Sequence, residues 1–539
     1  MKPVQQFMEK STLVFSLMLT ALLFVAMNVF FMSLLNSADD AFIMYPMSGG
    51  YGAAPTNLLH YRSGWHYWLS SPLQILFSKS PNVNWYCLSL LLFHFVGCTA
   101  ICWVAIRRLK AVWALLFYLS VFYFIETKLL FSLTYTGASL VSAIGAGLLI
   151  IHCFAVGRIR SVPMFAALLI LLLAGLLRLH VALLVGFILL MVAVVILQKR
   201  RLFLFFATIA GLLLVLVLSY RAHENYYRKH IPHWEQREQF SQALIYIFNR
   251  PIATDQPWQK VFKDTVERDF FSAGLYYDST HFTTERLKEI GQKIARRRWM
   301  NKKQDWGAAL WIFNDVKVFL ALAALIIASL WIQQKRNALK RLALLLLPVF
   351  ACFGYLFVFE KVTFTLQFGF LMMVFVFPVL LFNRMDDFVF ANRKLSWAAM
   401  GFFALLFLWR GVRIVEQHWI NVKNYSEFRC AMGGLLQHPD KLFLATDEGF
   451  PVTYFNIWDA PSEYPMKNIL YKNWWLSNGY PEITNAFGIY SVSELMQYRN
   501  LLLLGTPAPV MQTYYPDKTL SMPLPGYQCL EVRNLLERK

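Results

Sequence analysis

The sequence predicts an α-helical protein that crosses a membrane many times and ends in a small α/β domain. Of the 539 residues, 58% are hydrophobic and only 15% are charged, whereas soluble domains contain roughly 45–50% apolar and about 25% charged residues. Apolar runs also recur at lengths near the roughly 20 residues that a membrane-spanning helix needs. These two observations exclude a soluble enzyme, a disordered chain and a disulfide-stapled scaffold.

The apolar runs predict about eleven transmembrane helices. The first run is longer than the roughly 7–15 apolar residues of a secretory signal, so we expect it to be retained as a span. Some runs are short and need their flanking residues to cross the bilayer. The expected spans lie near residues 12–35, 85–106, 111–125, 133–156, 162–177, 183–197, 202–219, 318–332, 342–359, 363–382 and 397–409.

Lys and Arg residues concentrate on alternate connections between these spans. The basic connections lie at 107–110, 158–160, 199–201, 335–341 and 384–394, whereas the connections at 126–128, 178–180 and 360–361 carry little positive charge. Because short cytoplasmic loops concentrate Lys and Arg, the N-terminus is expected inside and the segments 36–84, 220–315 and the tail outside. These loops account for much of the net charge of +20, so no nucleic-acid partner is expected.

The predicted organisation is a transmembrane domain over residues 1–413 and an extracytoplasmic α/β domain over residues 414–539. Within the tail, a helix-like run at 428–436 precedes two strand-like runs at 441–446 and 501–505. Five of the seven cysteines lie in or beside spans and are expected to pack as small apolar side chains. Cys430 and Cys529 lie near the two ends of the tail, where they either form a disulfide or are two separate buried thiols.

The most informative segment follows the first span directly and begins with Asp39 and Asp40. Two adjacent carboxylates at the mouth of an apolar helix are costly unless they are solvated, paired or used. A carboxylate placed there could deprotonate an acceptor hydroxyl, or it could hold a divalent cation such as Mg²⁺ or Mn²⁺ against a phosphate. The other interpretation is a solvated helix end.

This segment resembles the GT-C superfamily of integral-membrane glycosyltransferases, and in particular arabinofuranosyl- and mannosyltransferase-like members. The resemblance rests on the run from Asp39 to Ile43, then on the glycines around Tyr51, then on Ser71-Pro72-Leu73. A long outer loop between spans 7 and 8 and an outer C-terminal domain are similar to that superfamily as well. The sequence departs from its pattern at 44–46, where an Arg is usual, and at 65–68, where an acidic residue is usual.

The resemblance implies an enzyme that transfers a sugar from a polyprenyl-phosphate donor to a glycan, lipid or protein acceptor. It implies a bacterial inner-membrane protein whose active site faces the periplasm. Asp39 or Asp40 would be the catalytic base, with Asp39 slightly favoured, and Arg178 and His180 would contact the lipid phosphate. For the last two residues, snorkelling to the membrane interface is the alternative.

Three further groups of residues are weaker candidates. Arg62 and His66 stand among aromatic residues that could bind a sugar or mark the membrane interface. Glu360 and Lys361 could pair with each other or line the same cavity as Arg178. A helix is expected at 284–294, beginning at a threonine and with Leu287, Ile290 and Ile294 on one face. Such an amphipathic helix is expected to lie in the membrane interface. It continues into a basic strip that includes Arg296 and Arg297 and that either attracts the donor phosphate or binds anionic headgroups.

Two non-enzymatic hypotheses remain beside the glycosyltransferase. A transporter or flippase for lipid-linked saccharides should show interrupted helices with polar groups near the midplane, whereas the charges here are expected at the span ends. A scaffold would act through its outer tail and would not need the acidic pair.

Overall fold

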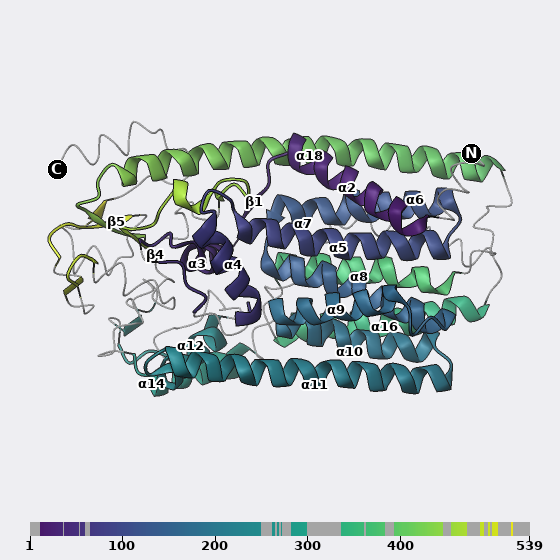
Figure 1. Ribbon diagram of the computed structural model, residues 1–539, viewed down its shortest axis with the longest axis horizontal. Helices are drawn as coiled ribbons and strands as arrows, with labels where there is room; N and C mark the ends of the chain where they lie inside the picture. The colour runs from purple at the N-terminus through teal and green to yellow at the C-terminus, as the bar shows by residue number, and fades with distance from the viewer. Residues whose placement is uncertain are drawn as a thin grey trace. The chain divides into compact units, whose positions relative to one another are not determined.

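The structure is a computed structural model that covers residues 1–539 and is mostly helical (Figure 1). The structure describes residues 11–248, 261–298, 336–359, 363–382, 393–445, 454–471, 486–489, 494–495, 498–504 and 519–520. Within these ranges it leaves out residues 36, 53, 60–64, 265–266, 269–270 and 272–281.

Eight of the described helices are long and apolar enough to cross a membrane, which is consistent with a polytopic helical membrane protein. The expected span at 318–332 lies outside the described residues. The one at 397–409 falls within α18 (Arg393–Leu436), and the one at 162–177 forms the shorter apolar helix α9 (Val162–Leu177). The eight helices are α2 (Thr12–Phe30), α5 (Trp85–Arg108), α6 with η1 and α7 (Ala111–Phe131), α8 (Tyr135–Val156), α10 (Leu179–Ile196), α11 (Lys199–His230), α16 (Arg336–Phe359) and α17 with η3 (Phe364–Leu381).

Large apolar side chains cover the outward faces of these helices. Val29 of α2, Val162 of α9 and Phe203 of α11 are each at least two-thirds exposed. Apolar patches that extend along whole helices are not stable against water in a soluble monomer, whereas lipid tails accommodate them because the helical backbone is already hydrogen-bonded internally.

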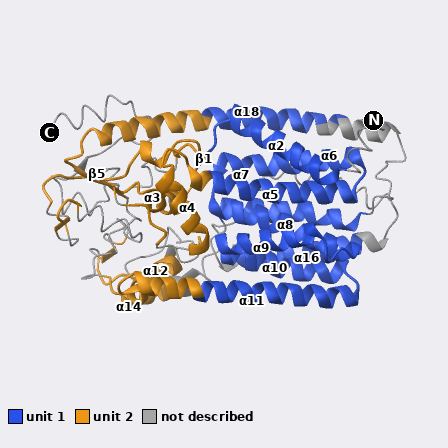
Figure 2. Ribbon diagram, viewed as in Figure 1, with its two compact units in different colours: residues 1–33, 88–221, 304–419 blue, residues 34–87, 222–303, 420–539 orange. Residues whose placement is uncertain are grey.

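The chain divides into two compact units, each built from three separate segments (Figure 2). Unit 1 comprises residues 1–33, 88–221 and 304–419, and unit 2 comprises residues 34–87, 222–303 and 420–539. The three segments of unit 2 correspond closely to the three segments that the charge pattern places on one side of the membrane. The tail therefore belongs to the same compact unit as the first outer loop and the long loop after span 7.

In unit 1 the helices lie side by side, and α8 is buried along nearly its whole length (Figure 2). Its sequence is rich in Gly, Ala and Ser, which allow neighbouring helices to approach closely. A Cβ placed on Gly145 of α8 would lie 2.3 Å from the carbonyl oxygen of Gly97 on α5. This glycine contact holds α5 and α8 backbone against backbone.

The third span differs from its prediction. A connection was expected at 126–128, but the helix runs on through the π-helical turn η1 (Val121–Glu126) and α7 (Thr127–Phe131) to β2 (Ser132–Leu133). Glu126 is therefore fully buried within unit 1 instead of lying in a solvated loop. Charged residues such as Glu126 and Lys128 are typical of a connection, but here the segment stays helical and packs within unit 1.

Unit 2 contains mainly short elements. They are β1 (Leu34–Leu35), α3 (Ala38–Ser48), α4 (Tyr67–Lys79), α12 (Trp234–Phe248), α14 (Thr284–Arg298), η5 (Pro461–Glu463) and a parallel sheet. The sheet has the order β4-β3-β5-β6, with β3 at Leu442–Ala445, β4 at Ile469–Tyr471, β5 at Leu501–Leu504 and β6 at Thr519–Leu520. Phe443 of β3 pairs with Ile469 and with Leu502, so the two predicted strand runs are adjacent strands.

Candidate functional site

The acidic pair forms the first turn of helix α3. Ser37 is the N-cap residue, and its side chain accepts a hydrogen bond of 3.2 Å from the backbone N–H of Asp39. Carboxylates are favourable at this position because the first N–H groups of a helix and the helix dipole stabilise negative charge. The helix ends at Gly49, whose φ of 74° suits a residue without a Cβ.

The first turn of α3 gives the two carboxylates different surroundings. Asp40 is fully buried, whereas Asp39 is partly exposed. The hydroxyl of Tyr86 donates a hydrogen bond of 2.5 Å to Oδ1 of Asp40, a length typical of a charge-assisted bond. Asp40 is therefore held in place, and Asp39 is the more exposed of the two carboxylates.

Trp65 and Tyr86 form an aromatic wall beside Asp40. The ring of Trp65 packs on the ring of Tyr86 at a centroid distance of 5.0 Å, and both side chains are buried. Trp65 has a φ of 54°, which a non-glycine residue adopts only at a cost of about 1–3 kcal/mol. Its indole N–H has no hydrogen-bond partner among the described residues. Strained backbone and an unsatisfied buried donor together mark this wall as a functional candidate.

Within unit 2, three hydrogen bonds join the tail to the first outer loop and the residues beside it. The backbone N–H of Met466 donates to the carbonyl of Gly50 at 2.7 Å, and the Asn84 side chain donates to the carbonyl of Asp459 at 3.0 Å. The Tyr45 hydroxyl donates to the carbonyl of Tyr464 at 3.1 Å. Burial raises the pKa of Tyr45, so it stays a neutral donor. The tail thus supports the turn that follows the acidic pair.

His66 lies in an aromatic cluster of unit 2. It precedes α4, and its Nδ1 accepts a hydrogen bond from the backbone N–H of Trp68. The His66 ring lies 4.9 Å from that of His223, and Tyr67 stacks on Tyr226 at 4.5 Å. These rings pack on one another and fix the loop to α11. Arg62, Glu360 and Lys361 lie outside the described residues.

Arg178 and His180 belong to unit 1; Arg178 joins α9 to α10, and His180 is the second residue of α10. The Arg178 guanidinium donates to the hydroxyl of Thr136 and lies 4.7 Å from the ring centroid of Tyr135, at the start of α8. His180 is exposed. The Arg178 side chain therefore already interacts with two residues of α8. Its expected contact with a donor phosphate stays a prediction.

The helix expected in the long loop is α14, but its apolar face does not lie open to lipid. Leu287 and Ile290 are fully buried, and a Cβ placed on Gly291 would lie 2.8 Å from the ring of Tyr246 on α12. The interfacial placement is therefore wrong for this face, because the amphipathic pattern reflects packing between α14 and α12. Arg296 and Arg297 lie in the last turn of α14, and their side chains are outside the description.

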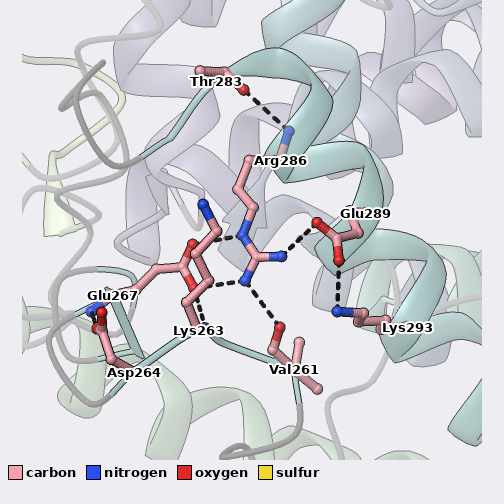
Figure 3. Close-up of polar contacts among 8 residues, drawn as sticks. All are labelled: Val261, Lys263, Asp264, Glu267, Thr283, Arg286, Glu289 and Lys293. Atoms are coloured by element: carbon pink, nitrogen blue, oxygen red, sulfur yellow. Dashed lines mark hydrogen bonds and ion pairs between the residues drawn. The ribbon is translucent and has the colours of Figure 1, made fainter.

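A buried ion-pair network anchors α14 (Figure 3). The guanidinium of Arg286 bonds both carboxylate oxygens of Glu267 at 2.6 Å, and it also contacts Glu289, which in turn pairs with Lys293. Burial alone would raise the pKa of Glu267, but the hydrogen bonds from Arg286 outweigh this effect and lower it. Two bonds in one plane make this a strong bidentate pair.

Cys430 is disulfide-bonded, and its expected partner Cys529 lies outside the described residues. Among the described residues, no three His, Cys, Asp or Glu side chains come together as a metal site would require. At the turn between α11 and α12 there is a hollow of about 440 Å³ lined by residues 228–236, which include two cations and two histidines. Arg228 there pairs with Glu235 at 3.2 Å.

Unit 1 also contains buried polar residues that the sequence did not reveal as buried, among them His94, Glu126 and Arg410. His94 and Glu126 form a pair with no exposed surface, and Arg410 of α18 donates to the carbonyl of Tyr123 and the hydroxyl of Thr127. The sequence feature that could have indicated these residues is a single polar residue within an apolar run. Intramembrane ionisable residues are rare enough to indicate function by default.

Comparison of the chain with protein-family models, with curated proteins and with solved structures finds no match in any of the three.

Proposed function

We propose that this protein is a membrane glycosyltransferase that moves a sugar from a polyprenyl-phosphate donor to an acceptor on the outer side of a bacterial inner membrane. The observation that carries the proposal is the acidic pair in the first turn of α3, directly after the first candidate span. One carboxylate is reachable and the other is locked in place. The resemblance of this segment to GT-C enzymes supports the same assignment.

In this proposal Asp39 is the general base. It takes the proton from the acceptor hydroxyl while that oxygen attacks the anomeric carbon of the donor sugar, and the polyprenyl phosphate leaves with the electrons of the broken bond. General-base catalysis contributes roughly 10²–10⁴-fold to a rate. Asp40 is a positioning residue, because its bond to Tyr86 fixes the first turn of α3 and hence the direction of Asp39.

A cation is needed for the leaving phosphate, because fixed positive charge acts most strongly where negative charge develops. Arg178 retains that expected role, and a divalent cation bound with the substrate could share it.

The test compares surface glycans by mass spectrometry in a deletion strain that carries the wild-type gene or a variant. Asp39→Asn should abolish addition of one specific sugar, while Tyr86→Phe should reduce it. Asp440→Asn, which removes an exposed carboxylate of the same unit, should leave the glycans unchanged. Equal amounts of membrane-inserted protein must be confirmed for each variant. Wild-type glycans in an Asp39→Asn/Asp40→Asn strain would contradict the enzyme hypothesis.

One observation favours the transporter alternative. The buried pair of His94 and Glu126 and the π-helical turn beside it lie inside candidate spans, whereas the sequence suggested that charges lie only at span ends. A flippase would move a lipid-linked saccharide across vesicles that contain the purified protein, and it would do so without Asp39. The scaffold alternative predicts that deletion of the tail abolishes function while both carboxylates are dispensable.

A further inference from the structure

Unit 1 holds a histidine–carboxylate pair deep within its helices. Nδ1 of His94 and Oε1 of Glu126 are 2.6 Å apart, and neither side chain has any exposed surface. His94 lies nine residues after the start of α5, which is about 14 Å along the helix at roughly 1.5 Å per residue. Glu126 is the last residue of the π-helical turn η1, and such turns occur frequently at functional sites.

The pair has two open hydrogen-bonding positions. Neither Nε2 of His94 nor Oε2 of Glu126 has a hydrogen-bond partner among the described residues. A buried polar atom left unsatisfied costs about 1–3 kcal/mol, and a purely structural pair would gain stability by satisfying both. Unfilled positions on two groups that can each accept a proton point to a proton as the ligand.

The titratable and polar groups around the pair come from each neighbouring helix. On α5, the Cys98 thiol lies within hydrogen-bonding reach of the Glu126 carboxylate, although Oε2 of Glu126 makes no hydrogen bond of normal geometry with the described residues. On the α8 side, a Cβ placed on Gly137 would lie 3.6 Å from Cε1 of His94 and 3.2 Å from the hydroxyl of Thr134. That hydroxyl is 3.5 Å from the hydroxyl of Thr365 on α17. Cε1 of His94, Thr134 and Thr365 therefore all lie close to Gly137.

The positive charge near the pair comes from α18. Arg410 is buried and donates to the carbonyl of Tyr123 at 3.0 Å and to the hydroxyl of Thr127 at 2.9 Å. Thr127 directly follows Glu126 in the chain. The guanidinium thus bonds a carbonyl of the π-helical turn and the residue that follows Glu126 in the chain.

A line of buried polar side chains leads from the pair to the beginning of α2. Tyr118 of α6 interacts electrostatically with Cys98 and Glu126, and its hydroxyl is 2.7 Å from that of Thr20. Four residues before Thr20, the Ser16 hydroxyl lies within reach of the Cys102 thiol and bonds the carbonyl of Thr12 at 2.7 Å.

These side chains form a polar seam, which we define as Thr12, Ser16, Thr20, Cys98, Cys102 and Tyr118. The three α2 members are at most 2% exposed, although most of α2 presents apolar side chains outward. Hydroxyl groups between membrane helices often act only as packing contacts. Packing alone, however, does not account for a seam that ends at an ionisable pair with open positions.

We propose that His94 and Glu126 form a proton-binding site that exchanges protons through the polar seam with the aqueous phase at the beginning of α2. In its empty state, neutral His94 donates its Nδ1–H to the Glu126 carboxylate, and the pair carries a charge of −1. One proton from water then binds at Oε2 of Glu126 or at Nε2 of His94, and the pair becomes neutral. The site is independent of the acidic pair of α3 and does not require the glycosyltransferase proposal.

Infrared difference spectroscopy of the full-length protein in lipid vesicles tests the site through a pH titration. The wild type should show a carboxyl signal that titrates, and this signal should be lost in Glu126→Gln and shifted in His94→Gln. Glu416→Gln removes an exposed carboxylate of α18 and should leave the signal intact. Identical difference spectra for wild type and Glu126→Gln would overturn the proposal. If Glu126→Gln does not fold, Glu126→Asp replaces it, and an unshifted signal in that variant counts against the site.

The seam is tested by the rate at which the same signal relaxes after a rapid pH change. Thr20→Val keeps the side-chain shape and removes the hydroxyl, so relaxation should slow. Thr208→Val removes an exposed hydroxyl that bonds only within α11 and should relax like the wild type. Equal rates for both variants would remove the seam from the proposal.

Discussion

The contact between Gly97 of α5 and Gly145 of α8 gives the sharpest test of the membrane unit. An alanine Cβ at position 145 would lie 2.3 Å from the carbonyl oxygen of Gly97, and one at position 97 would lie 2.5 Å from the carbonyl oxygen of Val141. Ordinary contacts of a Cβ begin at 3.4 Å. Because the obstructing atoms belong to a backbone, they cannot rotate away, and Gly145→Ala must push the helices apart by about 1 Å.

The cost of that movement follows from the packing that it opens. A gap of roughly 0.5–1 Å forfeits about a quarter to a half of each dispersion contact along the crossing, and overpacking substitutions in well-packed cores cost typically about 1–3 kcal/mol. We expect Gly145→Ala to lie near the upper end, at about 3 kcal/mol. Gly97→Ala combined with Gly145→Ala should cost less than the sum, because the first substitution has already separated the helices.

Denaturation of the purified protein in detergent micelles measures this loss as a lower unfolding midpoint. Gly211→Ala is the matched control, since a Cβ there meets nothing within 4 Å. That variant should be neutral or gain up to about 1 kcal/mol, because Ala favours a helix over Gly. Equal midpoints for Gly145→Ala and Gly211→Ala would refute the close approach of α5 and α8.

Three further predictions concern unit 2. Arg286→Met leaves the buried Glu267 carboxylate unpaired and should cost about 3–5 kcal/mol. This cost should appear as a loss of at least about two orders of magnitude in the hydrogen-exchange protection of α14. Glu289→Gln, on the exposed side of the network, should change this protection little. Because the folded-state pKa of Glu267 is lowered, the ion pair of Glu267 with Arg286 stabilises α14 at pH values above the ordinary glutamate pKa of 4.5. The hydrogen-exchange protection of the wild type should therefore fall as the pH drops below that value. Arg286→Met should not show this acid dependence. Tyr45→Phe removes the donor to the partly buried carbonyl of Tyr464 and should cost about 0.5–1.5 kcal/mol, measured as faster proteolysis of the tail without loss of membrane insertion.

Parts of the candidate site were readable from the sequence because they depend on local order in the chain. The position of Asp39 and Asp40 directly after an apolar run is a property of neighbouring residues, and so is the threonine that begins α14. The start itself differs slightly, since Thr283 accepts the hydrogen bond from the Arg286 N–H and is therefore the cap. Which acid is buried was not readable, because it depends on Tyr86, which is 46 residues away.

The alternation of charge and the apolar runs determined by themselves that the chain is helical and has many membrane-spanning segments. These features depend on local composition, because a bilayer imposes one length and one polarity on every span. Only the tertiary structure decided that three separate segments build one unit, that the apolar face of α14 packs on α12, and that Glu126 lies buried against His94. The physical reason is that burial and pairing are relations between distant parts of the chain, and a single apolar or charged residue looks the same in sequence whichever partner it meets.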